Sequence, residues 1–325
     1  MPDQDTELLI VGTGAMASLF AARLSAAGVA VTMLGTWREA LSELCEKGVT
    51  LVEADGSRQT YPVRATSRTS DCSGARNAIV LVKSWQTSRY ARQLHKLLSE
   101  DGVALTLQNG IGNREVLVEA LGAHRVALGI TTSGATMLSP GEVQAAGNGP
   151  IALSIHSRLG PLASMLRSAG FTVEEAPDPD VLLWGKLVIN AAINPLTALL
   201  RIPNGELLNR PTARALMASL AREAAAVADA QGIRLPFSNP VTAAEQTARR
   251  TASNYSSMLQ DVQRGAQTEI DAICGSIAEA GEQNDVPAPL NRTMWHLVSA
   301  LTVAKGKSAE GKAKRIQGNS LPANL

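Results

Sequence analysis

The 325-residue sequence has almost no excess charge: 30 lysines and arginines stand against 29 aspartates and glutamates, a formal net charge of +1. A chain so nearly neutral gives no reason to expect nucleic acid or an anionic membrane as its main partner. Cysteine is also scarce. The three cysteines are scattered without metal-ligand spacing, so we expect reduced thiols, a cytoplasmic location and no metal site.

Long apolar runs are missing as well. No stretch of about 18 uncharged apolar residues occurs, so no membrane-spanning helix is expected. The first residues, MPDQDTELLIVG, are acidic and lead into a glycine-rich turn, unlike a secretory signal peptide. With 45% hydrophobic and 18% charged residues, the composition is that of a soluble globular protein, and the length predicts two domains.

The first half of the chain alternates short apolar runs with helical patterns. The apolar runs predict buried strands near residues 7–11, 29–34, 78–82, 103–107 and 126–132. Strands separated by helices imply right-handed βαβ units and a mostly parallel sheet. The pair Asp55-Gly56 predicts a hairpin, and residues 142–145 are expected to pair with residues 151–155.

After Pro177 the pattern is almost entirely helical, with long helices expected near residues 180–200, 211–231, 243–250, 255–284 and 290–303. Gly265 falls inside the fourth of these, where glycine costs about 1 kcal/mol relative to alanine. We therefore predict an α/β fold: a Rossmann-type dinucleotide-binding domain (1–177), then an all-helical substrate and catalytic domain (178–304). Residues 305–325 are expected to form a flexible basic tail.

The first predicted strand leads into a helix through the segment Gly12-Thr13-Gly14-Ala15-Met16-Ala17. Gly12 permits a tight turn, Gly14 lets the backbone approach a pyrophosphate, and Ala17 still allows close helix packing. The helix N-terminus offers N–H groups and a positive dipole end to phosphates. The segment therefore predicts a dinucleotide site.

The tip of the second strand bears on the choice between NAD and NADP. An NAD site usually places a carboxylate there for the ribose hydroxyls, but residues 34–38 read LGTWR. Arg38 and Thr36 favour NADP(H), because a guanidinium and a hydroxyl can both bind a 2′-phosphate. The alternative is that Arg38 is a solvated residue in the first turn of a helix, where Glu39 beside it would oppose phosphate binding.

Polar residues interrupt an otherwise apolar helix in the second half. Lys186, Asn190 and Asn194 follow one another at i, i+4 and i+8 and so share one helix face. Polar groups in apolar surroundings are costly without partners, so this face suits the wall of a site, although the asparagines could also bridge helices structurally. A second polar group contains Ser257 and Glu269, and Glu269 could instead be a surface charge.

Taken together, the sequence resembles the ketopantoate reductase (2-dehydropantoate 2-reductase) family from about residue 8 to about residue 300. The matching segments are GTGAMA (12–17), VKSWQT (82–87), LQNGIG (107–112), GKLVINAAINPLTAL (185–199), PNGEL (203–207) and NYSSMLQDVQRGAQTEID (254–271). The resemblance implies NADP(H)-dependent reduction of the ketone of a small branched 2-oxo acid, ketopantoate, to pantoate.

The resemblance also implies roles for individual residues. Lys186 would be the general acid that protonates the alkoxide, and Glu269 would contact it and help to bind substrate. The implied substrate contacts are Asn109, Asn190, Asn194 and Ser257, and Asn109 would also lie near the nicotinamide. Lys83 and Gln86 fall on the cofactor side after a sheet strand. Many family members carry arginine where Thr36 stands, so Arg38 would have to replace it.

A lysine suits this chemistry, because hydride addition to a ketone builds negative charge on oxygen that an ammonium can stabilise and protonate. The alternatives are a reductase of another branched 2-oxo acid, a lysine-using 3-hydroxyacid dehydrogenase, and a redox sensor that binds the dinucleotide without chemistry. A histidine-based dehydrogenase is disfavoured, because the four histidines lie outside the polar clusters. Apolar helices in the second half would suit a homodimer.

Overall fold

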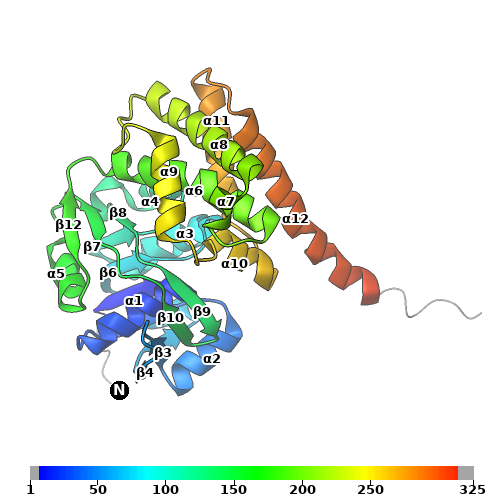
Figure 1. The fold of residues 1–325 in the computed structure, drawn as a ribbon. Helices are drawn as coiled ribbons and strands as arrows, with labels where there is room; N and C mark the ends of the chain where they lie inside the picture. Colours follow the sequence, from blue (N-terminus) through cyan, green and yellow to red (C-terminus); the bar gives the residue numbers. More distant parts are fainter. Residues whose placement is uncertain (1–6, 314–325) are drawn as a thin grey trace, which may run out of the picture. The chain divides into compact units, whose positions relative to one another are not determined.

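The computed structural model describes residues 7–313, with side chains described through Leu301 (Figure 1). Contacts within the chain divide it into two compact units, which meet between Leu183 and Trp184. Unit 1, up to Leu183, contains every strand of the described residues, and unit 2 is helical. The predicted fold class, a Rossmann-type unit followed by a helical one, is confirmed.

Unit 1 is built on an eight-stranded sheet of order β12-β11-β8-β7-β6-β1-β2-β5. Neighbouring strands run parallel, except that β11 and β8 are antiparallel. The strands of this sheet are β1 (Leu8–Val11), β2 (Val31–Leu34), β5 (Arg64–Thr66), β6 (Ala75–Val80), β7 (Leu98–Thr106), β8 (Val126–Thr131), β11 (Ile151–Ser154) and β12 (Val173–Ala176).

Helices pack on both faces of this sheet, which explains why its central strands are apolar throughout. Leu8 and Ile10 of β1 join one hydrophobic cluster, together with residues of α1 (Ala15–Ala26) and α5 (Gly160–Ser168). Leu9 and Val11 join the other cluster, together with residues of α3 (Thr87–Leu97) and α4 (Asn113–Leu121). Alternate side chains of one short strand thus enter both layers of the core.

A smaller sheet of order β4-β3-β10-β9 lies beside α1 and α2 (Arg38–Glu46) in unit 1 (Figure 1). The hairpin of β3 (Val49–Val52) and β4 (Arg58–Tyr61) is confirmed. The predicted pairing of residues 142–145 with 151–155 is wrong: β10 (Glu142–Ala145) pairs with β9 (Ala135–Ser139) and β3. Residues 151–154 instead form β11 in the large sheet. The chain changes sheets through Gly147, whose φ of 128° redirects it.

Unit 2 is a bundle of helices, and one long helix links it to unit 1. The helices are α6 (Pro179–Leu200), α7 (Glu206–Asn209), α8 (Pro211–Ala230), α9 (Pro240–Arg250), α10 (Ser257–Arg264), a π-helical turn η4 (Asp271–Gly275), α11 (Ser276–Gln283) and α12 (Pro289–Ala313). Helix α12 extends into the segment predicted as a flexible tail, 305–325, so the first part of that segment is helical. Residues 314–325 lie outside the described residues.

The first turn of α6 belongs to unit 1. Asp180 pairs with Arg114 of α4 at 3.1 Å, and Leu183 packs with Leu128 and Ile130 of β8. These contacts place the boundary between the units after Leu183, whereas the sequence suggests residue 177, where the composition changes.

Helix α6 is also long and apolar enough, by length and composition alone, to cross a membrane. Its most apolar stretch has a mean hydropathy of 1.3 and is 72% buried inside the protein, as in the core helix of a globular domain. Lys186 lies within this helix, which therefore contains no uncharged apolar run of about 18 residues.

The long helix predicted over residues 255–284 is wrong. Helix α10 ends at Gly265, which takes the left-handed conformation with φ 70° and caps the helix. The N–H groups of Gly265 and Ala266 close the last turn by donating to the carbonyls of Val262 and Asp261. Gly265 is therefore the stop signal of α10, and Glu269 lies in the irregular segment that follows.

Candidate active site

The glycine-rich turn after β1 is closed on its sheet side and open on the other. The N–H of Gly12 donates to the carbonyl of Leu34 at 2.8 Å, and φ at Gly12 is +133°. A Cβ on Gly12 would lie 3.1 Å from the backbone of Leu81, whereas one on Gly14 would meet nothing within 4 Å. The open side lies at the start of α1, whose first turn carries no acidic side chain, so the turn fits a pyrophosphate.

The other residues of the predicted fingerprint support this turn. Thr13 is buried and lies under Gly35, where a Cβ would come within 2.6 Å of the Thr13 methyl group. Ala15 and Met16 are partly exposed at the start of α1, and Ala17 is fully buried in the core. The small residues at positions 17 and 35 therefore permit the close packing that the motif requires.

The tip of β2 carries the residues predicted to distinguish NADP from NAD. Thr36 and Arg38 are exposed there, and Trp37 between them is 39% exposed. Thr36 precedes α2 and Arg38 begins it. Both side chains are therefore accessible at the carboxyl end of a parallel strand, where such folds bind the ribose.

The other cofactor-side residues follow β6 and β7. Lys83 and Gln86 are partly buried in a single turn after β6, in which the Gln86 N–H donates to the Lys83 carbonyl at 2.9 Å. Asn109 follows β7 and is partly buried, and its carbonyl accepts from Nδ2 of Asn113 at 3.0 Å. Because β6 and β7 are neighbouring parallel strands, these residues share one edge of the sheet.

Gln108 ties these two strand ends together, a role that the sequence analysis missed. Its buried Nε2 donates to the carbonyl of Val82 and to Oγ1 of Thr87, both at 2.8 Å. Thr87 in turn donates to Oδ1 of Asn113 at 2.8 Å. The only signal in the sequence was a glutamine directly after an apolar strand, beside Asn109.

Helix α6 carries the predicted catalytic face of unit 2. Asn194 is 7% exposed, and Lys186 and Asn190 are partly buried. Glu269 is 7% exposed. Burial lowers the pKa of Lys186 to about 8, and the negative charge of Glu269 opposes that shift. The structure thus brings Lys186 within electrostatic reach of Glu269, as an ammonium group that can release its proton near neutral pH.

The two adjacent serines of the SSMLQD segment differ in environment. Ser256 is buried, and its Oγ caps α10 by accepting from the Leu259 N–H at 3.1 Å. The same Oγ lies 2.7 Å from Oγ1 of Thr197, which is fully buried on α6. Ser257, the predicted substrate contact, is exposed in the first turn of α10. The buried hydroxyl pair therefore fixes the start of α10 against the helix that carries Lys186.

The PNGEL segment holds the loop that precedes these serines. The N–H groups of Asn204 and Gly205 donate to the carbonyls of Asn254 and Ala252, each at 3.0 Å. A Cβ on Gly205 would lie 2.7 Å from that of Ala252, so the contact needs glycine. The PNGEL segment thus fixes the loop at residues 252–254, which leads into the two serines.

Comparisons with known proteins agree with this architecture. The family model described as "Ketopantoate reductase PanE/ApbA" matches residues 8–158, and the model described as "Ketopantoate reductase PanE/ApbA C terminal" matches residues 180–302. Together the two models cover most of both units.

Individual relatives match over most of their length. The chain is 35% identical to a 2-dehydropantoate 2-reductase of Halobacterium salinarum, over 90% of this chain and 97% of the relative. It is 33% identical to the enzyme of the same name from Archaeoglobus fulgidus, over 89% of this chain and 95% of the relative.

Solved structures share the fold. A PanE/ApbA family ketopantoate reductase from Ralstonia eutropha superposes with a TM-score of 0.86 at 29% identity, covering 93% of this chain and all of its own. D-mandelate dehydrogenase, in a ternary structure with NADH and anilino(oxo)acetate, gives a TM-score of 0.85 at 25% identity, covering 92% of this chain and 99% of its own.

The contrast between Ser256 and Ser257 predicts different effects of the same substitution. Ser256→Ala removes a helix cap and the buried hydrogen bond to Thr197, whose hydroxyl keeps only its bonds to the carbonyls of α6, so the free energy of unfolding should fall by about 1–2 kcal/mol. Ser257→Ala, the matched control, changes an exposed side chain and should alter it by less than about 0.5 kcal/mol. Urea denaturation followed by circular dichroism measures both, and equal losses would contradict the assignment of the buried cap.

Proposed function

The chain belongs to the ketopantoate reductase family, and we propose on that basis that it reduces the ketone of ketopantoate to the alcohol of pantoate. Members of this family are nicotinamide-dinucleotide-dependent reductases that act on small 2-oxo acids. The environment of Lys186 carries the proposal. This ammonium lies on an apolar helix within electrostatic reach of Glu269, and burial lowers its pKa to about 8.

NADP(H) is the proposed cofactor. Residues 34–38 at the tip of β2 include no carboxylate, and the exposed Thr36 and Arg38 can both bind a phosphate on the ribose. Gly12, Gly14 and the start of α1 would hold the pyrophosphate, and Lys83, Gln86 and Asn109 would line the cofactor side of the sheet edge. When bound, the nicotinamide supplies the hydride that adds to the carbonyl carbon.

Lys186 is proposed to supply the proton. As the carbonyl oxygen gains negative charge, the ammonium stabilises it, and transfer of one N–H proton from Nζ completes the alcohol. Solvent returns the proton for the next turnover. A pKa of about 8 suits this step, because the amine is mostly protonated at neutral pH and yet gives up its proton readily. The carboxylate of Glu269 keeps it protonated over a wider pH range.

Asparagine and serine side chains are proposed to orient the substrate. The carboxamides of Asn109, Asn190 and Asn194 offer N–H donors to a carboxylate or carbonyl oxygen, and the exposed hydroxyl of Ser257 can donate or accept. Asn190 and Asn194 lie on the same helix as Lys186, one and two helical turns further along. This arrangement lets a 2-oxo acid bind with its carbonyl at the amine.

Location and partners stay predictions. The three cysteines are free thiols in the structure, which supports the proposed cytoplasmic location. A homodimer is proposed from the apolar helices of unit 2, and nucleic acid and membranes are not expected as partners.

A second candidate is the reduction of another 2-oxo acid with NADH, which the similarity to D-mandelate dehydrogenase favours. The test is the oxidation of NADPH or NADH by the purified chain with ketopantoate, branched and aromatic 2-oxo acids, and 3-oxo acids. We expect the highest kcat/KM for ketopantoate with NADPH. A higher value for an aromatic 2-oxo acid with NADH would establish the second candidate, and a preference for 3-oxo acids would reject both.

Loss of the proposed proton donor should abolish most of the activity. Lys186→Ala should lower kcat by about a hundredfold or more, because general acid catalysis is lost. Lys186→Arg, which keeps the charge, should be nearly as slow because a guanidinium hardly ever releases its proton. Steady-state kinetics measures kcat, with circular dichroism as the check on folding. Near-normal turnover in the folded alanine variant would eliminate the assignment.

The lowered pKa of Lys186 predicts how activity depends on pH. Ketone reduction needs the protonated amine, so kcat/KM should fall as the pH rises through about 8. The charge of Glu269 raises the pKa of Lys186, so Glu269→Gln should lower that pKa and move the fall in activity to lower pH. Profiles of kcat/KM between pH 6 and roughly 10 measure the shift. A profile unchanged or moved to higher pH would contradict the interaction.

A further inference from the structure

The carboxyl ends of three parallel strands meet at one corner of unit 1. The Gly12 N–H donates to the Leu34 carbonyl at 2.8 Å, and the Gly35 N–H donates to the Thr66 carbonyl at 3.1 Å. These bonds join the ends of β1, β2 and β5, in which each strand lies about 4.8 Å from its neighbour across the sheet. The chain after Thr66 therefore borders the tip of β2, on the outer edge of the sheet.

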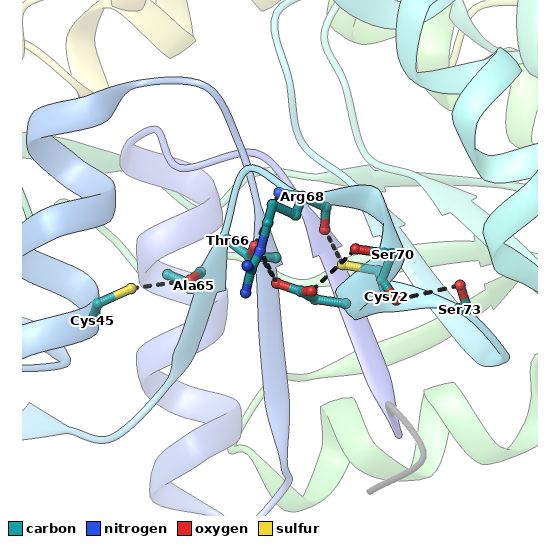
Figure 2. A network of polar contacts seen from close by, with 8 residues as sticks. Cys45, Ala65, Thr66, Arg68, Ser70, Cys72 and Ser73 are labelled. Carbon is teal, nitrogen blue, oxygen red and sulfur yellow. Dashed lines mark hydrogen bonds and ion pairs between the residues drawn. The ribbon is translucent and has the colours of Figure 1, made fainter. Parts of the chain in front are cut away.

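A compact polar network orders the turn after β5 (Figure 2). Oγ1 of Thr66 accepts from the N–H of Arg68 at 3.0 Å and donates to Oδ2 of Asp71 at 2.8 Å. Ser70 donates to the other carboxylate oxygen at 3.2 Å. The hydroxyl of Thr66, and then Arg68, lower the pKa of Asp71, so the carboxylate stays ionised and anchors the turn.

Asp71 also anchors the side chain of Arg68. Nε of the guanidinium donates to Oδ2 of Asp71 at 3.1 Å, yet the side chain of Arg68 is 79% exposed. Within residues 7–301, Asp71 is the only carboxylate paired with this guanidinium, and the pairing uses Nε. The two terminal nitrogens, which form the fork suited to a phosphate, are not used in this pair.

A second arginine follows the tip of β2. Arg38 begins α2, which packs along β5: Cys45 of this helix donates to the carbonyl of Ala65 at 3.0 Å (Figure 2). Because β2 pairs with β5, Thr36 and Arg38 follow the strand next to the one that leads to Arg68. This tip is where a Rossmann fold reads the 2′ position of the adenine ribose.

We propose that Arg68 is a specificity-determining residue that binds the 2′-phosphate of NADP(H) together with Thr36 and Arg38. The inference rests on the proposed NADP(H) function and adds a residue to its phosphate site. A phosphate carries nearly two negative charges and several acceptor oxygens, so two guanidinium groups bind it better than one. Arg68 also neutralises Asp71, whose bare carboxylate would otherwise repel the phosphate. The ion pair between Nε of Arg68 and Asp71 restricts the side chain before the ligand binds, which lowers the entropic cost of binding.

The test compares two ligands that differ only in the 2′-phosphate. Isothermal titration calorimetry on the full chain measures Kd for adenosine 2′,5′-bisphosphate (2′,5′-ADP) and for 5′-AMP. Arg68→Gln should weaken the binding of 2′,5′-ADP by about tenfold and that of 5′-AMP by less than about twofold. Arg64→Gln is the matched control, because it removes the same charge from an exposed residue at the amino end of β5. It should change neither Kd by more than about twofold.

Three results of these titrations would contradict the proposed role of Arg68. Equal weakening of both ligands by Arg68→Gln, or no weakening of either, would overturn the role of Arg68, as would an equal effect of Arg64→Gln. A wild-type chain that binds 2′,5′-ADP no more tightly than 5′-AMP would reject the NADP(H) preference and the inference with it. Reduction of ketopantoate by the unmodified chain tests the reaction separately, so a failure of the reaction is not confused with a failure of the phosphate site.

Discussion

The proposed chemistry of this protein depends on keeping one ammonium group in apolar surroundings. Lys186 lies on α6 among Leu187, Val188 and other buried side chains, and burial lowers its pKa to about 8. The carboxylate of Glu269 limits that shift, so the amine holds a proton at neutral pH and can still release it. An exposed lysine, with a pKa of about 10.4, would hold its proton too firmly, and a buried lysine without a nearby carboxylate would lose its proton at too low a pH.

Buried hydrogen bonds within each unit fix the elements that carry the proposed site residues. Thr197 and Ser256 join α6 to the start of α10, and the backbone of Asn204 holds the loop just before it. Gln108 has a similar part in unit 1, where it locks the ends of β6 and β7 together. Such bonds keep the reacting and binding groups in place before substrate arrives, which is where much of the rate enhancement of an enzyme originates.

The sequence predicted most of the βαβ order, the dinucleotide turn and the helical second half, because each leaves a local pattern of apolar spacing and glycine. The sequence-based prediction failed where contacts between distant segments determine the structure. Nothing near β10 or β11 shows which strand each will join, and the short strands β5 and β9 carry no clear alternation. Gly265 looked like a helix-interior residue because its left-handed φ cannot be seen in the sequence. At the site, spacing placed Lys186 and Asn194 on one face, but the closeness of Glu269 came only from the family resemblance, because an irregular segment separates it from α10.

The position of β5 at the outer edge of the sheet has an evolutionary consequence. The side chains of Thr36, Arg38 and Arg68 are exposed there and take no part in the hydrophobic core. Mutations of such residues cost little folding stability, whereas those in the glycine-rich turn disturb tight packing. Under the proposed assignment of these residues to the 2′ position of the ribose, descendants of this protein can change which nicotinamide dinucleotide they prefer by a few surface substitutions, without rebuilding the Rossmann-type unit.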